Sequence, residues 1–328
     1  MVMFWVAVLA ISLLLYVLLD GFDLGVGILF GRTGNEERRH AMLSAVAPIW
    51  DGNETWLVVA GVILWGAFPV VYATLFSAFY LPLLLMLAGL ILRGVAFEYR
   101  YKTERMRWIW DTSFAGGSLV AAFMQGMTVG ALVEGLPITN GQYTGGEFGW
   151  FSAFAVLCGL GLCLGYALLG ACWLIRKCEG DVREEAYRLI PYLSVGLLAF
   201  LVIVFVYALA ADLRVMHRWL ERPYLFFFPA IGVIAALVAA ESVRSRRDGV
   251  PYYMVALIFT AAFGTLAISF WPYMIPFSIT IAEAAAPHSS LAFMFWGAGL
   301  FVFPLMLIYT VISYSVFRGK VRPTADHY

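Results

Sequence analysis

Long apolar runs occupy most of the sequence, and they limit the fold more than any other feature. They extend over residues 3–29, 54–75, 77–97, 113–134, 150–175, 188–211, 224–243, 251–272 and 290–317. Each run is close to the roughly 20 residues that cross a bilayer as one helix. Of the chain, 62% is hydrophobic and only 13% is charged, whereas a soluble domain averages about 25% charged residues. The sequence therefore predicts an all-α integral membrane protein with about nine transmembrane helices, forming a single polytopic domain over residues 1–328.

The basic residues predict how the helices are oriented. Lysine and arginine are enriched in cytoplasmic loops, and 18 of the 21 basic residues fall on one predicted side. These are Arg32, Arg38, Arg39, Arg93, Arg100, Lys102, Arg105, Arg107, Arg176, Lys177, Arg183, Arg188, Arg244, Arg246, Arg247, Arg318, Lys320 and Arg322. We therefore expect a periplasmic N-terminus and a cytoplasmic C-terminus. The first run shows no small-residue cleavage site, so it is predicted to be a retained helix.

Two pairs of carboxylates interrupt this apolar pattern. Asp20 with Asp23, and Asp51 with Glu54, stand three residues apart at the margins of the first two runs. Residues at that spacing share one face of a helix. Ionisable side chains at the edge of a membrane span are expensive to keep there, so they indicate a functional site. We predict that these four carboxylates handle protons near the cytoplasmic surface.

Structural explanations remain open for several of these residues. An Asp followed three residues later by Glu is a capping-box pattern, so Asp51 and Glu54 can simply begin a helix. Asp23 can extend to the interface or cap a helix. Arg93, near the end of the third run, can also extend its head group to the interface. Alternatively, Arg93 pairs with one of the carboxylates, which would remove much of the cost of burying both charges.

The histidines argue against a haem ligated by this chain alone. A membrane haem usually needs an axial histidine, and all four histidines lie in predicted loops or in the tail: His40, His217, His288 and His327. The arginines cluster only in short loops between apolar runs, which leaves no surface for a nucleic acid. We therefore expect neither a haem held by this chain alone nor a nucleic-acid partner.

Four sequence blocks resemble a known family. They are residues 20–27 (DGFDLGVG), 47–56 (APIWDGNETW), 93–100 (RGVAFEYR) and 271–276 (WPYMIP). Their order and spacing resemble subunit II of the cytochrome bd-type quinol oxidases, and the similarity extends over essentially the whole chain. The first two blocks are the most specific. The sequence of the second block is most similar to that of the cyanide-insensitive branch of the family.

The resemblance implies properties that composition alone does not indicate. Subunit II of this family is haem-free and shares a fold of two four-helix bundles plus one peripheral helix. Its partner, subunit I, binds haems b558, b595 and d, oxidises quinol and reduces dioxygen to water. The resemblance also implies a bacterial inner-membrane location within lipid, and it allows for a small single-span accessory subunit and a structural quinone.

The resemblance gives the carboxylates a role in proton entry. It implies that Asp20 and Asp51 belong to a cytoplasmic path that delivers protons to subunit I. Asp23 and Glu54 are further candidates for that path, and Arg93 is a candidate for structural ion pairing. Two other functions remain open. One is a proton-coupled secondary transporter that uses the same carboxylates, and the other is a purely structural membrane subunit.

Overall fold

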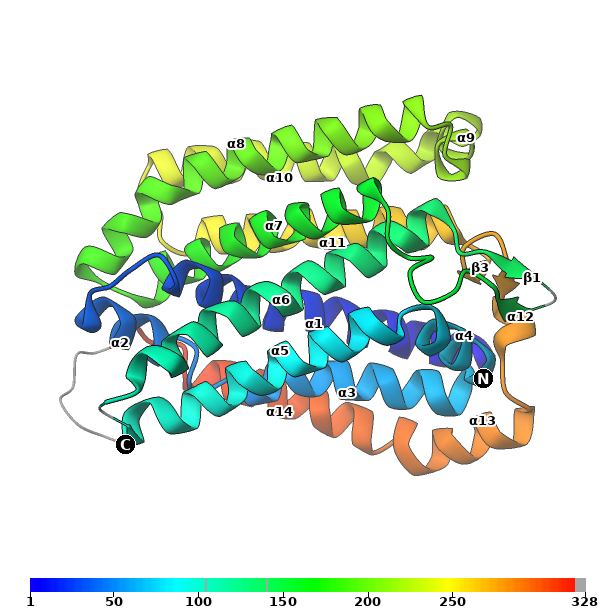
Figure 1. Ribbon diagram of the computed structural model, residues 1–328, viewed down its shortest axis with the longest axis horizontal. Helices are drawn as coiled ribbons and strands as arrows, with labels where there is room; N and C mark the ends of the chain where they lie inside the picture. Colours follow the sequence, from blue (N-terminus) through cyan, green and yellow to red (C-terminus); the bar gives the residue numbers. More distant parts are fainter. Residues whose placement is uncertain (104, 140, 322–328) are drawn as a thin grey trace.

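The computed structural model describes residues 1–103, 105–139 and 141–321, and most of them are helical (Figure 1). Arg322 and His327 lie outside the described residues. The α-helices are α1 (Val2–Phe30), α2 (Glu36–Ser44), α3 (Trp50–Ala67), α4 (Pro69–Ala78), α5 (Tyr80–Tyr99), α6 (Arg107–Glu134), α7 (Ala153–Lys177), α8 (Gly180–Ala210), α9 (Arg214–Glu221), α10 (Phe227–Arg244), α11 (Val250–Phe270), α12 (Ile281–Ala284), α13 (His288–Met294) and α14 (Val302–Val316). A π-helical turn, η3 (Phe295–Gly299), lies between α13 and α14, and two 3-10 turns, η1 (Arg100–Lys102) and η2 (Pro223–Phe226), complete the helical elements.

Within the described ranges, eight helical segments are long and apolar enough to cross a membrane. A ninth span results if α3 and α4 are counted together, although the pair is bent by 119°. The predicted second span, residues 54–75, is therefore wrong as one straight helix. Pro69 has no N–H to donate, so it ends α3 at Ala67 and begins α4 as a new helix.

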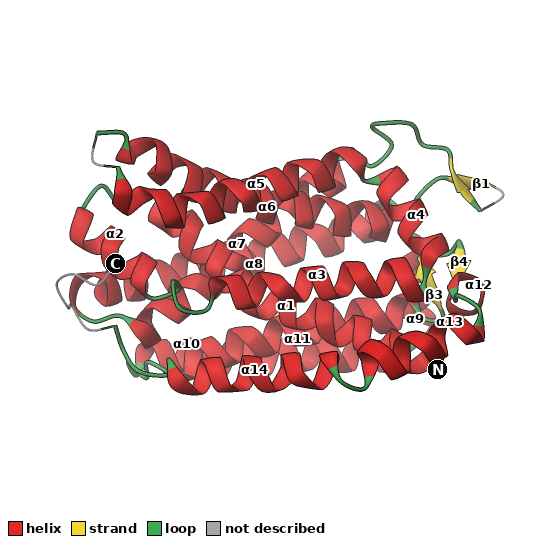
Figure 2. Cartoon of the chain, turned by 90° about the horizontal axis from the view of Figure 1, so that it is seen from below, coloured by secondary structure: helices red, strands yellow, loops and turns green. Residues whose placement is uncertain are grey.

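Within the residues that the structure describes, the long helices form two groups of four, with one further segment, α13 to α14, beside them (Figures 1 and 2). In the first group α1 packs against α3 and α6, and α5 packs against α6. In the second group α7 packs against α8 and α11, and α10 packs against α11. The last segment, α13 to α14, follows α3, because Met294 meets Gly66 and Tyr309 meets Gly52. This arrangement agrees with the expected two bundles and one peripheral helix.

Helix α1 joins the two groups, because it also packs closely against α7. A Cβ atom added at Gly25 would lie 1.8 Å from the Tyr166 carbonyl oxygen, and one at Gly170 would lie 2.5 Å from the Gly25 carbonyl carbon. Only glycine permits such an approach between the two backbones, as small residues do at membrane helix interfaces. The middle of α1, which carries Asp20 and Asp23, is consequently buried on several sides.

The two ends of the bundle differ in structure. One end, here called the α2 end, carries α2 and the last described residues of the chain (Figure 1). The opposite end carries the N-terminus and two short antiparallel hairpins: β1 (Ile138–Thr139) with β2 (Gln142–Tyr143), and β3 (Tyr273–Ile275) with β4 (Ile279–Thr280). Ion pairs among the described residues gather at the α2 end. Asp20 and Asp23 lie in the second half of α1, which runs from the hairpin end toward the α2 end, so they are nearer to this charged surface than to the hairpins.

Asp248, in the loop between α10 and α11, ties that loop to α8 and to the tail. Its Oδ1 lies 2.8 Å from Arg183 Nη2, its Oδ2 lies 2.9 Å from Lys320 Nζ, and the Tyr187 hydroxyl donates to Oδ1 at 2.7 Å. Partial burial opposes ionisation of Asp248, but hydrogen bonds from Arg183, Lys320 and Tyr187 outweigh it and lower its pKa to about 2.

We expect Asp248→Asn to lower the midpoint of thermal unfolding at pH 7 by a few degrees, which corresponds to about 1–2 kcal/mol. Because the folded pKa is depressed, the stabilisation is complete above the unfolded pKa of about 4 and is lost as the pH falls toward 2. Scanning fluorimetry of the detergent-solubilised protein at several pH values measures both midpoints. A gap between wild type and variant that stays constant from pH 7 to pH 3 would contradict this account.

Candidate functional site: a buried carboxylate cluster

Arg93 on α5 is the centre of a polar cluster inside the helix bundle. Its side chain is fully buried, and its Nη2 lies 2.7 Å from Asp20 Oδ1. The same nitrogen donates to Glu54 Oε1. Asp20 comes from α1 and Glu54 from α3, so one guanidinium joins three helices. The head group is therefore held inside the bundle, and it does not extend to the interface.

Asp23 joins the cluster through an amide. Asn53 Nδ2 on α3 donates to Asp23 Oδ2 at 2.7 Å, and the same nitrogen lies 3.3 Å from the Leu19 carbonyl oxygen. The Tyr314 hydroxyl on α14 donates to Asn53 Oδ1 at 2.9 Å. Asp23 is 2% exposed and Asn53 is 1% exposed, so this hydrogen-bonded chain lies away from solvent.

The cluster contains more acidic groups than basic ones. Throughout the described part of the chain, Arg93 is the one cation in ion-pair contact with Asp20 or Glu54, and Asp23 has no ion-pair partner. Glu54 alone reaches the surface, with 23% of its side chain exposed. Ionisation of all three carboxyl groups would leave net negative charge in a poorly hydrated region, which is costly. Such a group of carboxyls can take up and release protons.

Three carboxyl oxygens in the cluster have no hydrogen-bond partner among the residues described. Asp20 Oδ1 has only its ion-pair contact with Arg93, while Asp20 Oδ2 and Asp23 Oδ1 have no contact of either kind, and Arg93 Nε and Nη1 are also without partners there. Buried polar atoms are nearly always hydrogen-bonded in proteins, to protein groups or to ordered water. These atoms therefore mark where a water molecule or a transferred proton can be accommodated between the helices.

Asp51 lies outside the buried cluster but next to it. It is the second residue of α3, is exposed, and stands one helical turn before Glu54. The capping-box explanation is wrong, because the residue before α3 is Ile49 and no side chain caps the helix. Asp51 still lies in the first turn, where the helix dipole favours negative charge. The order from surface to interior is Asp51, then Glu54, then Arg93 with Asp20.

Sequence reasoning missed Asn53 and Tyr314. Asn53 stands between two of the predicted carboxylates, in the block at residues 47–56, so its position alone could have indicated a role. Tyr314 lies 261 residues farther along the chain and has no local pattern that distinguishes it from other aromatic residues of an apolar helix. Only the packing of α14 along α3 brings Tyr314 to the site.

A second polar chain continues from Asp20 toward the middle of the bundle. Gln125 Nε2 on α6 donates to the Tyr16 hydroxyl at 2.6 Å, and the Tyr166 hydroxyl on α7 donates to Gln125 Oε1 at 2.9 Å. Tyr16 precedes Asp20 by one helical turn on α1. The three side chains therefore connect α1, α6 and α7 by hydrogen bonds at the depth of Asp20 and beyond.

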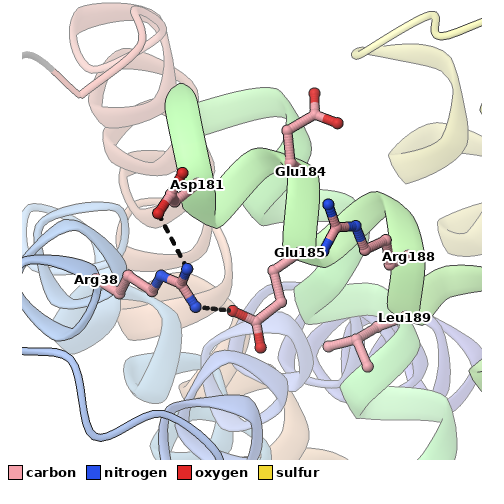
Figure 3. A pocket seen from close by; sticks show the side chains of 6 residues that line it. All are labelled: Arg38, Asp181, Glu184, Glu185, Arg188 and Leu189. Carbon is pink, nitrogen blue, oxygen red and sulfur yellow. Dashed lines mark hydrogen bonds and ion pairs between the residues drawn. The ribbon is translucent and has the colours of Figure 1, made fainter.

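The remaining charged clusters at the α2 end have a structural explanation. Arg100, only 1% exposed, pairs with Asp111 at 2.5 Å and with Glu36 at 2.9 Å. A surface cavity of about 360 Å³ lies between α2 and α8 (Figure 3). Arg38 pairs there with Asp181 and Glu185. Each of these ion pairs joins α2 or η1 to another helix, so they fix the short helix to the bundle.

The described residues hold no group of three or more His, Cys, Asp and Glu side chains that could bind a metal ion. His40 lies in α2, His217 lies in α9, and His288 begins α13; all three side chains are exposed. None of these three histidines lies inside the bundle, where the axial ligand of a membrane haem would be needed.

Comparisons with known proteins agree with this architecture. Residues 1–317 match the family model described as cytochrome bd terminal oxidase subunit II. A probable cytochrome oxidase subunit 2 from Haemophilus influenzae is 32% identical, over 97% of this chain and 94% of that protein. Cytochrome bd-I ubiquinol oxidase subunit 2 from Escherichia coli is 29% identical, over 97% and 94%.

A solved structure has the same fold. The bd oxidase from Geobacillus thermodenitrificans contains a chain that matches with a TM-score of 0.78 and 15% identity, covering 96% of both chains. At that identity the similarity supports the fold, while the family match over residues 1–317 supports the membership. Together with the sequence blocks around Asp20, Asp51 and Arg93, these matches show that the chain belongs to the subunit II family of the cytochrome bd terminal oxidases.

Proposed function

We propose that this chain works as the haem-free subunit II of a quinol oxidase complex. In this proposal it binds a haem-bearing subunit I, and the complex couples quinol oxidation to the reduction of dioxygen to water. The family membership and the names of the relatives support this role. The proposal assigns haems b558, b595 and d to subunit I, as membership of the subunit II family implies. A structural quinone and a small accessory subunit remain compatible with the proposal.

The chain is a multi-pass protein of the bacterial inner membrane, as its apolar helices and its family membership indicate. We assign the α2 end to the cytoplasm, because basic residues gather in the short helices, helix ends and loops there: Arg38, Arg39, Arg100, Arg183, Arg246 and Lys320. The carboxylate cluster then opens toward the cytoplasmic surface. This orientation places Asp51 where it can receive protons from the cytoplasm.

Within the complex, the chain supplies part of the proton-input path. The observation that carries this proposal is the carboxyl series that runs from exposed Asp51 through half-buried Glu54 to buried Asp20, with Arg93 between the last two. Protons consumed in making water enter at Asp51, pass the cluster and cross to subunit I. Protons from quinol are released on the opposite side, so charge separates across the membrane without a conformational pump.

The proposal predicts that Asp51→Asn slows dioxygen consumption several-fold, because the variant keeps the shape of the side chain but cannot carry a proton. The haem absorbance spectrum of the purified complex should be unchanged. Turnover per haem, measured with an oxygen electrode at saturating quinol, checks the result. Glu37→Gln is the matched control, since Glu37 is an exposed carboxylate of α2 outside the cluster. Full turnover in Asp51→Asn would remove Asp51 from the path.

The purely structural alternative makes a different prediction. If the carboxylates serve only as ion pairs, Asp51→Asn should alter neither turnover nor assembly, because Asp51 is exposed and has no ion-pair partner among the described residues. A secondary transporter would act without a haem-bearing partner. Copurification of the tagged chain in mild detergent, with a reduced-minus-oxidised spectrum, distinguishes this case, since a colourless chain that purifies alone would contradict the oxidase role.

A further inference from the structure

The neighbours of Asn53 determine which way its amide nitrogen and amide oxygen face. One of its polar atoms lies 3.3 Å from the Leu19 carbonyl oxygen, and a carbonyl oxygen can only accept a hydrogen bond. The atom facing Leu19 is therefore the amide nitrogen. The amide oxygen consequently faces Tyr314, whose hydroxyl must donate to it at 2.9 Å. The direction of donation from Tyr314 to Asn53 to Asp23 follows without any choice of amide flip.

The hydrogen bonds from Tyr314 to Asn53 and from Asn53 to Asp23 reach only one of the two Asp23 carboxyl oxygens. Oδ2 accepts the Asn53 N–H at 2.7 Å, while Oδ1 is buried and has no hydrogen-bond partner among the residues that the structure describes. A carboxyl group can carry its proton on either oxygen, but an oxygen that accepts a short hydrogen bond is the poorer place for it. Oδ1 is therefore the oxygen available for proton exchange.

We propose that Asn53 and Tyr314 are positioning residues of the proton path. Tyr314 fixes the Asn53 amide, the amide occupies Asp23 Oδ2, and Asp23 Oδ1 remains free to take up and release the proton. Helix α14 thereby completes a site whose other members lie on α1, α3 and α5. This inference rests on the proposed function, because it assigns roles within the same proton path.

The chain after α14 holds Tyr314 in place. Tyr314 stands three residues before Phe317, whose carbonyl oxygen accepts a hydrogen bond from Lys177 Nζ. The same Nζ donates to the Gly319 carbonyl oxygen at 3.1 Å, and the Val321 N–H donates to the Lys177 carbonyl oxygen at 2.8 Å. The end of α14 is thus bound to the end of α7, which limits the movement of the Tyr314 hydroxyl away from Asn53.

Several other titratable or charged groups lie around Asp23. They are Asp20 on α1, Glu54 on α3, Arg93 on α5, Tyr252 on α11 and Tyr314 itself on α14, while Tyr166 on α7 faces Asp20. A Tyr314→Phe variant leaves all the charged members of this group unchanged. Any change in its pH profile is then attributable to the loss of the single hydroxyl and its effect on Asn53.

The test uses the intact complex with Tyr314→Phe and Asn53→Leu. We expect Tyr314→Phe to lower turnover at saturating quinol by about fivefold, the equivalent of one net hydrogen bond, and to leave the KM for quinol unchanged. Asn53→Leu should lower turnover further, because the amide that donates to Asp23 is itself lost. When the Asn53 amide is displaced or removed, Asp23 holds its proton more strongly. The pH profile of turnover should therefore move about 0.5 unit toward higher pH in the variants. If Asn53→Leu fails to assemble, Tyr314→Phe alone still decides the outcome.

Tyr309→Phe is the matched control. Tyr309 lies on the same helix, and its ring packs against Gly52, next to Asn53 in sequence, yet it is 54% exposed and its hydroxyl does not bond Asn53. We expect this variant to keep the wild-type turnover and pH profile. Equal effects of Tyr309→Phe and Tyr314→Phe would overturn the proposal, because they would indicate a general effect of changing α14.

Infrared difference spectroscopy separates the failure of this inference from failure of the proposed function. The protonated carboxyl band that Asp23→Asn removes should shift in Tyr314→Phe, whatever the route of the protons. An unshifted band would overturn the positioning role. A shifted band with unchanged turnover and pH profile would also overturn it, since the chain would then not act in the reaction. Full turnover in Asp51→Asn alongside a slow Tyr314→Phe would contradict the entry at Asp51 and support the inference.

Discussion

Arg93→Leu is expected to prevent accumulation of the assembled complex. The substitution removes the one cation that contacts buried Asp20 and half-buried Glu54 within the described residues, and removing one partner of a buried ion pair costs about 3–5 kcal/mol. That amount is a large fraction of the stability of a typical protein. The measurement is the yield of complex in membranes, by immunoblot of the tagged chain and by haem content.

The design of this experiment includes a rescue. Adding Asp20→Asn to Arg93→Leu removes one of the unpaired charges, so the double variant should accumulate more complex than Arg93→Leu alone. Arg32→Leu is the control for loss of a basic residue, because Arg32 is exposed near the end of α1. Normal yield of Arg93→Leu would show that the cluster tolerates unpaired carboxyls, and the ion pair would then contribute little to assembly.

The helices of this fold could be predicted because the membrane imposes their length. Eight of the nine predicted runs each overlap one long helical segment of the structure, and the ninth, residues 54–75, covers both α3 and α4, which are separated at Pro69. Hydropathy does not register the break, since the residues on both sides are apolar. The proline was visible, but prolines inside membrane helices are often tolerated, and only the surrounding packing decides whether a helix continues past one.

The site was predictable in its charged members and not in its neutral ones. Asp20, Glu54 and Arg93 are conspicuous because a charge in an apolar run is rare, and their depth along the helices indicated that they could meet. The capping explanation for Asp51 was wrong, because a cap at Asp51 requires the helix to begin at Gly52, whereas α3 begins at Trp50 with Ile49 as its N-cap. Tyr314 could not be found, since a tyrosine at the end of a membrane helix ordinarily lies at the interface without a specific partner.

The structure separates two kinds of buried carboxylate. Asp111 is paired with two arginines, at 2.7 Å to Arg39 and 2.5 Å to Arg100, so its negative charge is fully compensated. Asp20 shares Arg93 with Glu54, and its Oδ2 has no protein partner in the described chain. A carboxylate of the first kind has an arginine on each oxygen, whereas one of the second kind leaves an oxygen open to a proton or a water molecule. We therefore propose proton transfer at the cluster around Arg93 and not at Asp111.

Asp20→Asn tests this distinction directly, and we expect turnover per haem to fall by at least about tenfold. General acid–base groups contribute about 10²–10⁴-fold where proton transfer limits the rate, and asparagine matches the size of aspartate without carrying a proton. The complex should still assemble, because Arg93 keeps its contact with Glu54. Dioxygen consumption normalised to haem measures the rate, and the haem spectrum checks that the site in subunit I is unchanged.

Asp111→Asn is the matched comparison for Asp20→Asn, since both remove a buried carboxylate that contacts an arginine. The Asp111 variant should have a lower thermal unfolding midpoint and a turnover per haem close to wild type. The Asp20 variant should have a much lower turnover per haem and an unfolding midpoint close to wild type. Proton uptake by proteoliposomes would fall with turnover in the Asp20 variant alone. Equal loss of turnover in both variants would mean that these carboxylates act through the packing of α1 and α6, and the proton path would then lie outside the Arg93 cluster.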